Sequence, residues 1–284
     1  MSEIEKKQNP LAGFFRQPKI YITLPSNGTF YPPGALEFTQ TGEIPVYAMT
    51  ARDELMFKTP DALMNGTSTV EVIRSCIPNI KNPWAMPSID VDAVLAAIRI
   101  ATYGHEMEVT STCPNCQHVD DFTLDLRLAL DNFRNIKFNT DILIDDTILV
   151  KVRPLTYDEL TKASLKVFEH QRIFSIVNDT SIPDEEKIKL FQDSFVKLTD
   201  LTFSTVSQSI VSVETSAGKT DDKLFIEEFL RNTDKKIFTE INKAIESSKK
   251  ASIMPPVESE CTECHHKYNM TLTLDQSDFF GKGF

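Results

Sequence analysis

The sequence predicts an α+β protein built from two related modules, each made of helices followed by a cysteine-bearing β-hairpin. Three observations carry this prediction: two C-x-x-C pairs lie far apart, the segments around them align without a gap, and apolar residues at helical spacing precede each pair. With 284 residues, of which 41% are hydrophobic and 25% charged, the chain has the composition of a globular protein that buries a core.

The two cysteine segments form the clearest internal repeat. Residues 108–126 (EVTSTCPNCQHVDDFTLDL) align without a gap on residues 256–274 (PVESECTECHHKYNMTLTL). Each segment has the pattern of a strand, a tight turn that holds the cysteine pair, and a second strand of alternating apolar residues. Both segments are therefore predicted to be β-hairpins of the knuckle type.

The cysteines of these hairpins predict one shared metal site, formed by Cys113, Cys116, Cys261 and Cys264. Four thiolates in this spacing give a closed tetrahedral zinc site, in which no coordination position stays open for water or substrate. Closing the long intervening loop costs roughly 4–5 kcal/mol, whereas structural zinc sites supply about 10–16 kcal/mol. We therefore expect one structural Zn²⁺ per chain, held by two zinc-knuckle hairpins in a zinc-ribbon-like site with pseudo-twofold symmetry.

Other uses of these residues stay open. The cysteine pairs could remain reduced without metal, or each pair could form a disulfide. A histidine could also replace a cysteine ligand, and the candidates are His118, His265 and His266. A thioredoxin-like redox role is disfavoured, because the pairs lie on hairpins rather than at a strand-to-helix turn. The fifth cysteine, Cys76, is predicted to be a buried apolar side chain.

The repetition extends upstream of the hairpins. The aligned segments are 44–55 with 148–160, 68–77 with 204–213, and the predicted helices 90–104 and 222–248. In the first aligned pair, an Asp-Glu-Leu sequence begins a predicted helix. Thr50 and Thr156 are the candidate N-caps, one residue out of step relative to the Asp-Glu-Leu match. Chance similarity between two α+β halves is the alternative explanation.

This repetition predicts the organisation of the chain. An N-terminal arm at 1–36 precedes a first repeat at 37–136 and a second repeat at 137–284. The second repeat carries an insertion at 162–198, predicted to form two helices around a break at 182–184. The arm is rich in aromatic residues and either packs on the core or docks on a neighbour. The C-terminal tail predicts partner docking through Phe279, Phe280 and Phe284.

Charge and composition argue against several classes of protein. A net charge of −11 opposes nucleic-acid binding, and acidic residues flank both cysteine turns. No run of apolar residues is long enough to span a membrane, and the N-terminus lacks the apolar segment of a secretory signal. Cysteines in metal-ligand spacing fit a reducing cytosol better than a disulfide framework.

No catalytic motif is present. The triplet Gly218-Lys219-Thr220 would belong to a phosphate-binding loop only with a glycine at position 213, where the chain has Val213. The zinc deaminase, H-E-x-x-H and G-x-S-x-G signatures are also missing. We therefore expect no enzymatic activity and no small-molecule substrate.

Three stretches carry a likeness to a known family: PKIYITLPSNGTFYPPG, DELMFKTPDALMNGTSTVEVIRSCIPNI and IRIATYGHEMEVTSTCPNC. They resemble the baseplate hub proteins of T-even-type contractile-tail bacteriophages, most strongly over 18–126. The resemblance implies a hub subunit or hub assembly factor that contacts other tail and hub proteins in the cytoplasm of the infected bacterium. It leaves open whether the protein stays in the finished virion tail baseplate.

Under this resemblance, the stretch 59–68 is a candidate contact loop with Leu63 and Met64 as apolar anchors. A helix that packs inward is the alternative for this stretch. The alternative function is a nucleic-acid-binding zinc-ribbon protein, which would require a basic surface that the sequence does not show.

Overall fold

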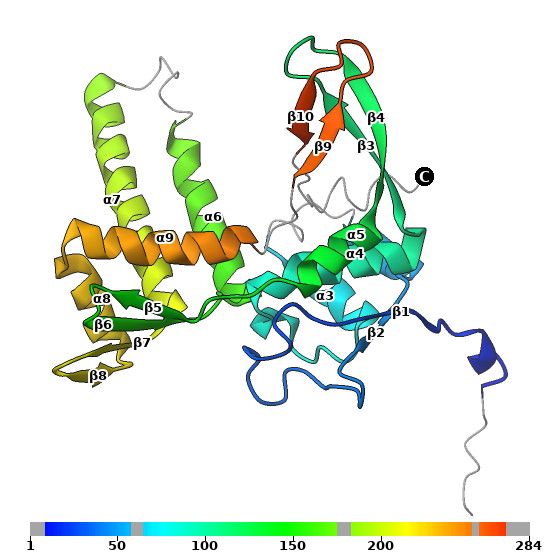
Figure 1. Ribbon diagram of the computed structural model, residues 1–284, viewed down its shortest axis with the longest axis horizontal. Coiled ribbons are helices and arrows are strands. Elements are labelled where there is room, and N and C mark those ends of the chain that lie inside the picture. Colours follow the sequence, from blue (N-terminus) through cyan, green and yellow to red (C-terminus); the bar gives the residue numbers. More distant parts are fainter. Residues whose placement is uncertain (1–8, 58–64, 175–182, 252–255, 271–284) are drawn as a thin grey trace, which may run out of the picture.

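The computed structural model shows an α+β protein in which helices and small antiparallel sheets form two hydrophobic cores (Figure 1). It describes residues 9–57, 65–174, 183–251 and 256–270. The predicted α+β class is confirmed. Within the described residues, no helix has the length and apolar character needed to cross a membrane.

The first core forms around α4, a helix whose side chains are buried on most sides. Its elements are η1 (Ala12–Phe14), β1 (Pro18–Ile22), β2 (Ile44–Tyr47), α1 (Ala51–Phe57), α3 (Thr67–Cys76), η2 (Pro83–Ala85) and α4 (Ser88–Tyr103). Ile22 and Leu24 of the predicted arm are buried in this core. The backbone N–H and hydroxyl of Ser26 donate to the buried Asp90 carboxylate at 2.8 and 2.6 Å. This part of the arm therefore packs on the core.

The second core lies between a four-stranded antiparallel sheet and three helices. The strand order is β5-β6-β7-β8, with β5 (Asp141–Ile144), β6 (Ile148–Val152), β7 (Ile210–Thr215) and β8 (Gly218–Thr220). The helices are α7 (Asp184–Ser209), which precedes β7, and α8 (Lys223–Asn232) and α9 (Lys235–Ala251), which follow β8. A further helix, α6 (Tyr157–Phe174), packs against α7. Val150, Ile210, Ile226 and Ile241 are fully buried between these elements.

A short pairing of backbone segments joins the two halves. The Tyr157 N–H donates to the Met86 carbonyl at 2.8 Å, and the Ser88 N–H donates to the Leu155 carbonyl at 2.7 Å. The Trp84 and Tyr157 rings stack with centroids 5.7 Å apart. The start of α6 is therefore anchored in the first core, although most of that helix packs with α7.

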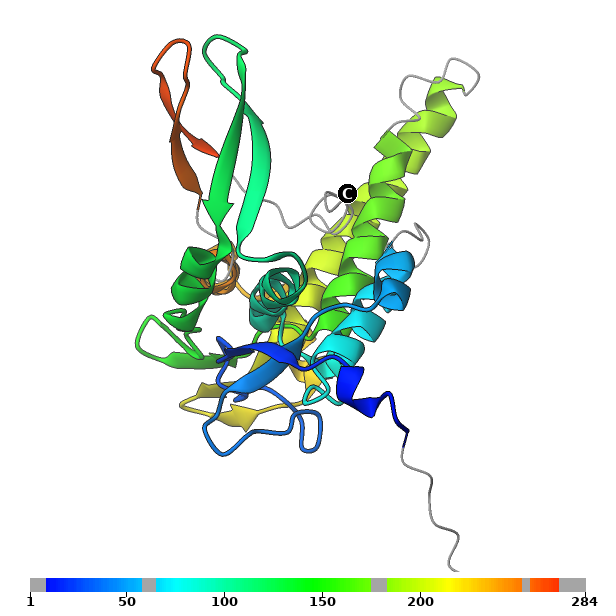
Figure 2. The same cartoon turned by 90° about the vertical axis from the view of Figure 1, so that its right-hand side faces the viewer.

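Two β-hairpins project together from the body of the protein (Figures 1 and 2). They are β3 (Glu106–Thr112) with β4 (Val119–Asp125), and β9 (Val257–Glu260) with β10 (Lys267–Met270). The helix α5 (Leu126–Arg134) follows β4 without a loop and buries Leu126 and Phe133 in the first core. The first hairpin is thus anchored at its base by apolar packing.

The helices α1 and α6 begin with the same capping arrangement. In α1 the Asp53 carboxylate accepts the Thr50 N–H at 2.8 Å, and the Thr50 hydroxyl accepts the Asp53 N–H at 3.3 Å. In α6, Glu159 and Thr156 make the same two hydrogen bonds at 2.8 and 3.2 Å. The structure therefore aligns Asp53 with Glu159, one residue later than the Asp-Glu-Leu alignment.

Several predicted helices have different bounds. The single helix expected over 222–248 is wrong: α8 ends at Asn232 and α9 begins at Lys235. Thr233 is extended, and Thr-Asp sequences favour helix ends because their side chains compete for backbone hydrogen bonds. The two helices expected within 162–198 exist but extend beyond it, from Tyr157 and to Ser209.

The aligned segments 68–77 and 204–213 differ in structure. Most of the first lies within α3, whereas the second ends α7 at Ser209 and begins β7 at Ile210. A strand at this position completes the sheet of the second core, so tertiary packing overrides the local similarity.

Candidate metal centre

Two hairpins from distant parts of the chain lie side by side and bring four cysteines together (Figures 1 and 2). Cys113 and Cys116 lie at the turn between β3 and β4, and Cys261 and Cys264 lie at the turn between β9 and β10. Their four sulfur atoms all lie within 4.8 Å of one another. The structure therefore gathers all four sequence-predicted ligands, which could hold a metal ion.

The two cysteine turns have the same backbone structure. The Cys113 N–H donates to the His118 carbonyl at 2.8 Å, and the Cys261 N–H donates to the His266 carbonyl at 3.0 Å. Gln117 and His265 occupy the same position in each turn, both with positive φ, and their N–H groups donate to the first cysteine's carbonyl at 3.0 Å. The gap-free sequence alignment thus corresponds to equivalent backbone hydrogen bonds.

The strand register around the turns is also the same. Thr112 pairs with Val119 and Ser111 with Asp120 in the first hairpin; Glu260 pairs with Lys267 and Ser259 with Tyr268 in the second. Each pair in the second hairpin lies at the aligned positions of a pair in the first. An identical register places both cysteine turns at equivalent points of their hairpins.

The sulfur separations suit a tetrahedral metal ion. The Sγ atoms of Cys113 and Cys264 are 3.7 Å apart, and those of Cys116 and Cys261 are 3.5 Å apart. A zinc ion with bonds of about 2.3 Å would place its sulfur ligands about 3.8 Å apart. A disulfide would need about 2.05 Å, and all five cysteines are free in this structure.

The thiols differ in their electrostatic surroundings. The Asn115 amide donates to Cys264 Sγ at 3.6 Å and, with the His266 N–H, lowers the pKa of the Cys264 thiol to about 6. For Cys116, the His118 N–H favours the thiolate, but contacts with neighbouring cysteines raise its pKa to about 12. Neighbouring thiols thus stabilise one thiolate in this cluster. A divalent metal held by the four cysteines would take the place of the thiol protons.

A carboxylate joins the two hairpins beside the sulfur atoms. Asp120 on β4 is buried, and it accepts the Thr262 N–H at 3.2 Å as well as the Thr262 hydroxyl. These hydrogen bonds lower the pKa of Asp120. The same carboxylate lies 3.4 Å from His118 Nε2. Asp120 therefore holds the second cysteine turn against the first hairpin through direct hydrogen bonds.

This bridge has no symmetric counterpart. At the aligned positions, Tyr268 replaces Asp120 and Pro114 replaces Thr262. Proline has no N–H to donate, and the buried Tyr268 hydroxyl makes no hydrogen bond with any residue that the structure describes. The repeat therefore gives no sequence signal for Asp120. From the sequence alone, Asp120 is only one of the acids that flank the cysteine turn.

The family model of the T4 bacteriophage base plate protein matches residues 17–281. The chain belongs to this family. No curated protein and no solved structure matches it. Because the match covers both cores and both cysteine turns, the features described above all belong to a phage baseplate protein.

Two of the candidate histidines of this baseplate protein, His118 and His265, lie beside the cysteine turns. His118 faces Asp120, and the exposed His265 ring lies 3.2 Å from Glu260. The group of potential metal ligands found within the described residues consists of the four cysteines alone. Cys76 is far from them in the first core, where it is fully buried, and burial raises its pKa to about 12. Its predicted role as a buried apolar side chain is confirmed.

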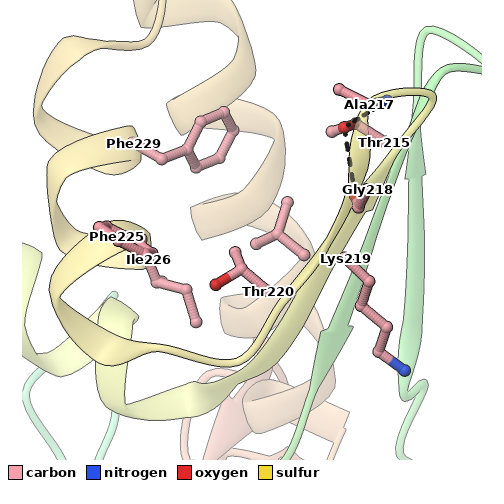
Figure 3. Close-up of a pocket in the computed structure, with 9 residues that line it drawn as sticks. Thr215, Ala217, Gly218, Lys219, Thr220, Phe225, Ile226 and Phe229 are labelled. Atoms are coloured by element: carbon pink, nitrogen blue, oxygen red, sulfur yellow. Dashed lines mark hydrogen bonds between the residues drawn. The ribbon is translucent and has the colours of Figure 1, made fainter.

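The Gly218-Lys219-Thr220 triplet of the baseplate protein is strand β8 and not a loop before a helix. It lines a hollow of about 310 Å³ together with Phe225 and Phe229 of α8 (Figure 3). Figure 3 shows Lys219 pointing away from this hollow. The triplet therefore lacks the arrangement that binds phosphate in nucleotide-binding loops.

The predicted contact residues of the baseplate protein lie outside the described residues. They are Leu63, Met64, Phe279, Phe280 and Phe284. Gly66, just after the first of these segments, has a positive φ, and an added Cβ would meet Thr161 and Tyr157 of α6 at 3.2 Å. The chain that enters α3 thus passes close to the start of α6.

Proposed function

We propose that the protein is a subunit or an assembly factor of the central baseplate hub. It acts through contacts with other tail and hub proteins, and it assembles with them in the cytoplasm of the infected bacterium. The observation that carries this proposal is the match to the baseplate family over residues 17–281. The donor set supports it, because four cysteines leave no open position at a metal and suit a structural role.

We infer that the metal is one structural Zn²⁺ per chain. Thiolates are soft ligands that select zinc, and zinc accepts a tetrahedral set without a preference of its own for another geometry. The bound ion would supply only charge and bonds to four thiolates. Cys113 and Cys116 would hold it from the first hairpin, and Cys261 and Cys264 from the second.

We also propose that the chain arose by internal duplication, with an arm at 1–36 and repeats at 37–136 and 137–284. Two matched local structures support this origin: the identical register of the two hairpins, and the capping pairs Thr50–Asp53 and Thr156–Glu159. Each repeat then contributes half of the metal site, so that the zinc-ribbon-like centre joins the two repeats.

Replacing Asp120 by Ala is expected to weaken zinc binding about 10- to 100-fold, which is the usual effect of removing a group that orients the ligand shell. The reason is that Asp120 positions the turn carrying Cys261 through its bonds to Thr262. The measurement is zinc affinity by competition with a chromogenic chelator. Asp121→Ala is the matched control, because Asp121 is exposed and, among the described residues, its carboxylate bonds to Thr110 of its own hairpin alone. Equal affinities for the two variants would contradict the positioning role of Asp120.

The hub proposal is tested by affinity capture of the tagged protein from infected cells. Mass spectrometry is run on the captured proteins and on the finished particles. We expect tail and hub proteins to be captured. Persistence of the protein in particles identifies a subunit, and its absence from them identifies an assembly factor. Capture of nucleic acid or of host metabolic enzymes in place of tail proteins would overturn the proposal.

A further inference from the structure

A cavity of about 900 Å³ lies where the two halves of the protein meet. It is lined by the start of α4 and by α6, α7 and α9, and its walls are mainly apolar, with Phe138, Leu155, Phe168, Leu201 and Ile245 among them. Phe168 is 48% exposed, so the cavity leaves an aromatic ring open to solvent. Its size falls within the range of sites that bury a ligand or a short peptide.

The chain itself leads to the mouth of this cavity. Ile245, Glu246 and Lys249 in the last turns of α9 line it. Met270, the last residue of β10, pairs with Val257 at the base of the second hairpin. Figures 1 and 2 both show this base close to the C-terminal end of α9. The segment after Met270 therefore starts near the cavity.

The segment after Met270 is long enough to reach the cavity, whatever path the chain takes between Lys249 and Val257. Lys249 precedes Val257 by eight residues, so Met270 lies at most about 34 Å from Lys249. Phe280 follows Met270 by ten residues and can extend about 36 Å from it. A tether this short gives an effective concentration in the millimolar range, well above that of a second molecule.

The chemistry of the tail suits the cavity. Three phenylalanines lie within its last six residues, at 279, 280 and 284, and Asp278 directly precedes the first. The baseplate family match runs to residue 281 and so includes Phe279 and Phe280. Lys249 lines the cavity and is exposed, and no salt bridge joins it to another described residue. The tail sequence thus offers apolar rings with an adjacent carboxylate, and the cavity offers apolar walls with the ammonium group of Lys249 beside the carboxylates of Glu246 and Asp92.

We propose that the tail of the same chain docks in this cavity, with Phe279 and Phe280 inside it and Asp278 at Lys249. The docked tail covers the apolar walls that α6, α7 and α9 leave open. It also connects the end of the second hairpin to the junction between the two halves. Asp92 also lines the cavity, and its burial raises the pKa of its carboxyl to about 6. This raised pKa agrees with the apolar character of the site.

Photo-cross-linking of the full chain tests this proposal. A benzophenone amino acid replaces Phe280, and cross-linked peptides are mapped by mass spectrometry after irradiation. The expected products join residue 280 to α6, α7 or α9 of the same molecule. Cross-links to another molecule, to a different part of the chain, or none at all would each overturn the proposal.

Hydrogen exchange gives a second test with a matched control. Replacing Phe279 and Phe280 by Ser is expected to speed amide exchange in the cavity-lining turns of α6 and α9 by about tenfold or more. The control replaces Phe14 and Phe15 by Ser; this second Phe pair is 86% and 58% exposed, at the end of η1 and just after it. Figure 1 shows the segment before β1 on the opposite side of the protein from α6, α7 and α9. Equal exchange in the two variants would overturn the docking.

A charge exchange tests the polar contact. Lys249→Glu is expected to lower the yield of the cross-link from residue 280, because it places two carboxylates together. Adding Asp278→Lys in the same chain is expected to restore the yield. If Lys249→Glu leaves the yield unchanged, or if the double variant fails to restore it, Asp278 does not contact Lys249.

Discussion

Chains in which Cys113 and Cys116 are both replaced by Ser are expected to contain no zinc and to release the second hairpin, while both cores stay folded. Two-stranded hairpins are marginally stable in water when they stand alone. The second hairpin has four residues in each strand, and its contacts with the first are made through the cysteines and through Asp120. Removing two ligands therefore removes most of what holds it in place.

Three measurements check this prediction. Metal content is expected to fall from one zinc per chain to none, protease cleavage is expected to become fast within 256–270, and assembly with other tail proteins is expected to fail. Cys76→Ala is the control, because Cys76 is a buried cysteine outside the sulfur cluster. A double variant that lacks zinc, resists cleavage in this hairpin and assembles fully would show that the metal site is not structural.

Replacing Phe133 by Ala is expected to destabilise the first core by about 3–5 kcal/mol and to leave zinc binding intact. Phe133 is 1% exposed and lies on α5, the helix that joins the first hairpin to the core. Its removal leaves a cavity in the first core, which could be filled only if α4 moved. The cysteine turns lie at the far end of the hairpin and do not depend on this contact.

The measurement is urea unfolding of the zinc-loaded protein, with the metal content determined in parallel. Leu128→Ala on the same helix is the matched control, because Leu128 is 66% exposed and its truncation is expected to cost less than about 0.5 kcal/mol. Comparing Phe133→Ala with the cysteine variants separates two stabilising interactions. We expect apolar packing to stabilise the cores and metal ligation to hold the second hairpin. Loss of zinc in Phe133→Ala would show that the two are not separate.

The cysteine turns could be predicted in detail because their signal is local. A C-x-x-C turn between two strands repeats the same short-range hydrogen bonds wherever it occurs, so a gap-free alignment was enough to predict matched hairpins. Cys76 was also predictable, because an unpaired cysteine in an apolar segment is usually buried. In these cases the side-chain pattern and the backbone conformation depend on the same few residues.

Contacts between distant residues, and the exact ends of helices, could not be predicted. Asp120 bonds to Thr262, far along the chain, and its aligned partner is Tyr268, so neither spacing nor repetition marks it. The Asp-Glu-Leu match misaligned the α1 and α6 caps by one residue, because a capping pair needs only an acid three residues after Thr50 or Thr156. The break between α8 and α9 was missed because apolar spacing continues across Thr233.

A structural metal at this position would join parts of the chain that packing alone leaves separate. The first hairpin continues into the first core through α5, whereas the second hairpin follows α9 of the second core. One ion held by both hairpins would therefore link the two halves at a point distant from the junction at Tyr157. Such a double connection suits a protein that must keep a fixed shape while other subunits assemble on it.

X-ray absorption at the zinc edge, with the metal content of the same sample, is the decisive measurement for the shared four-cysteine centre. We expect one zinc per chain surrounded by four sulfur atoms at about 2.3 Å, with no nitrogen or oxygen ligand. A purified chain without zinc, or a zinc ion with fewer than four sulfur ligands, would contradict a closed four-cysteine centre shared by the two hairpins.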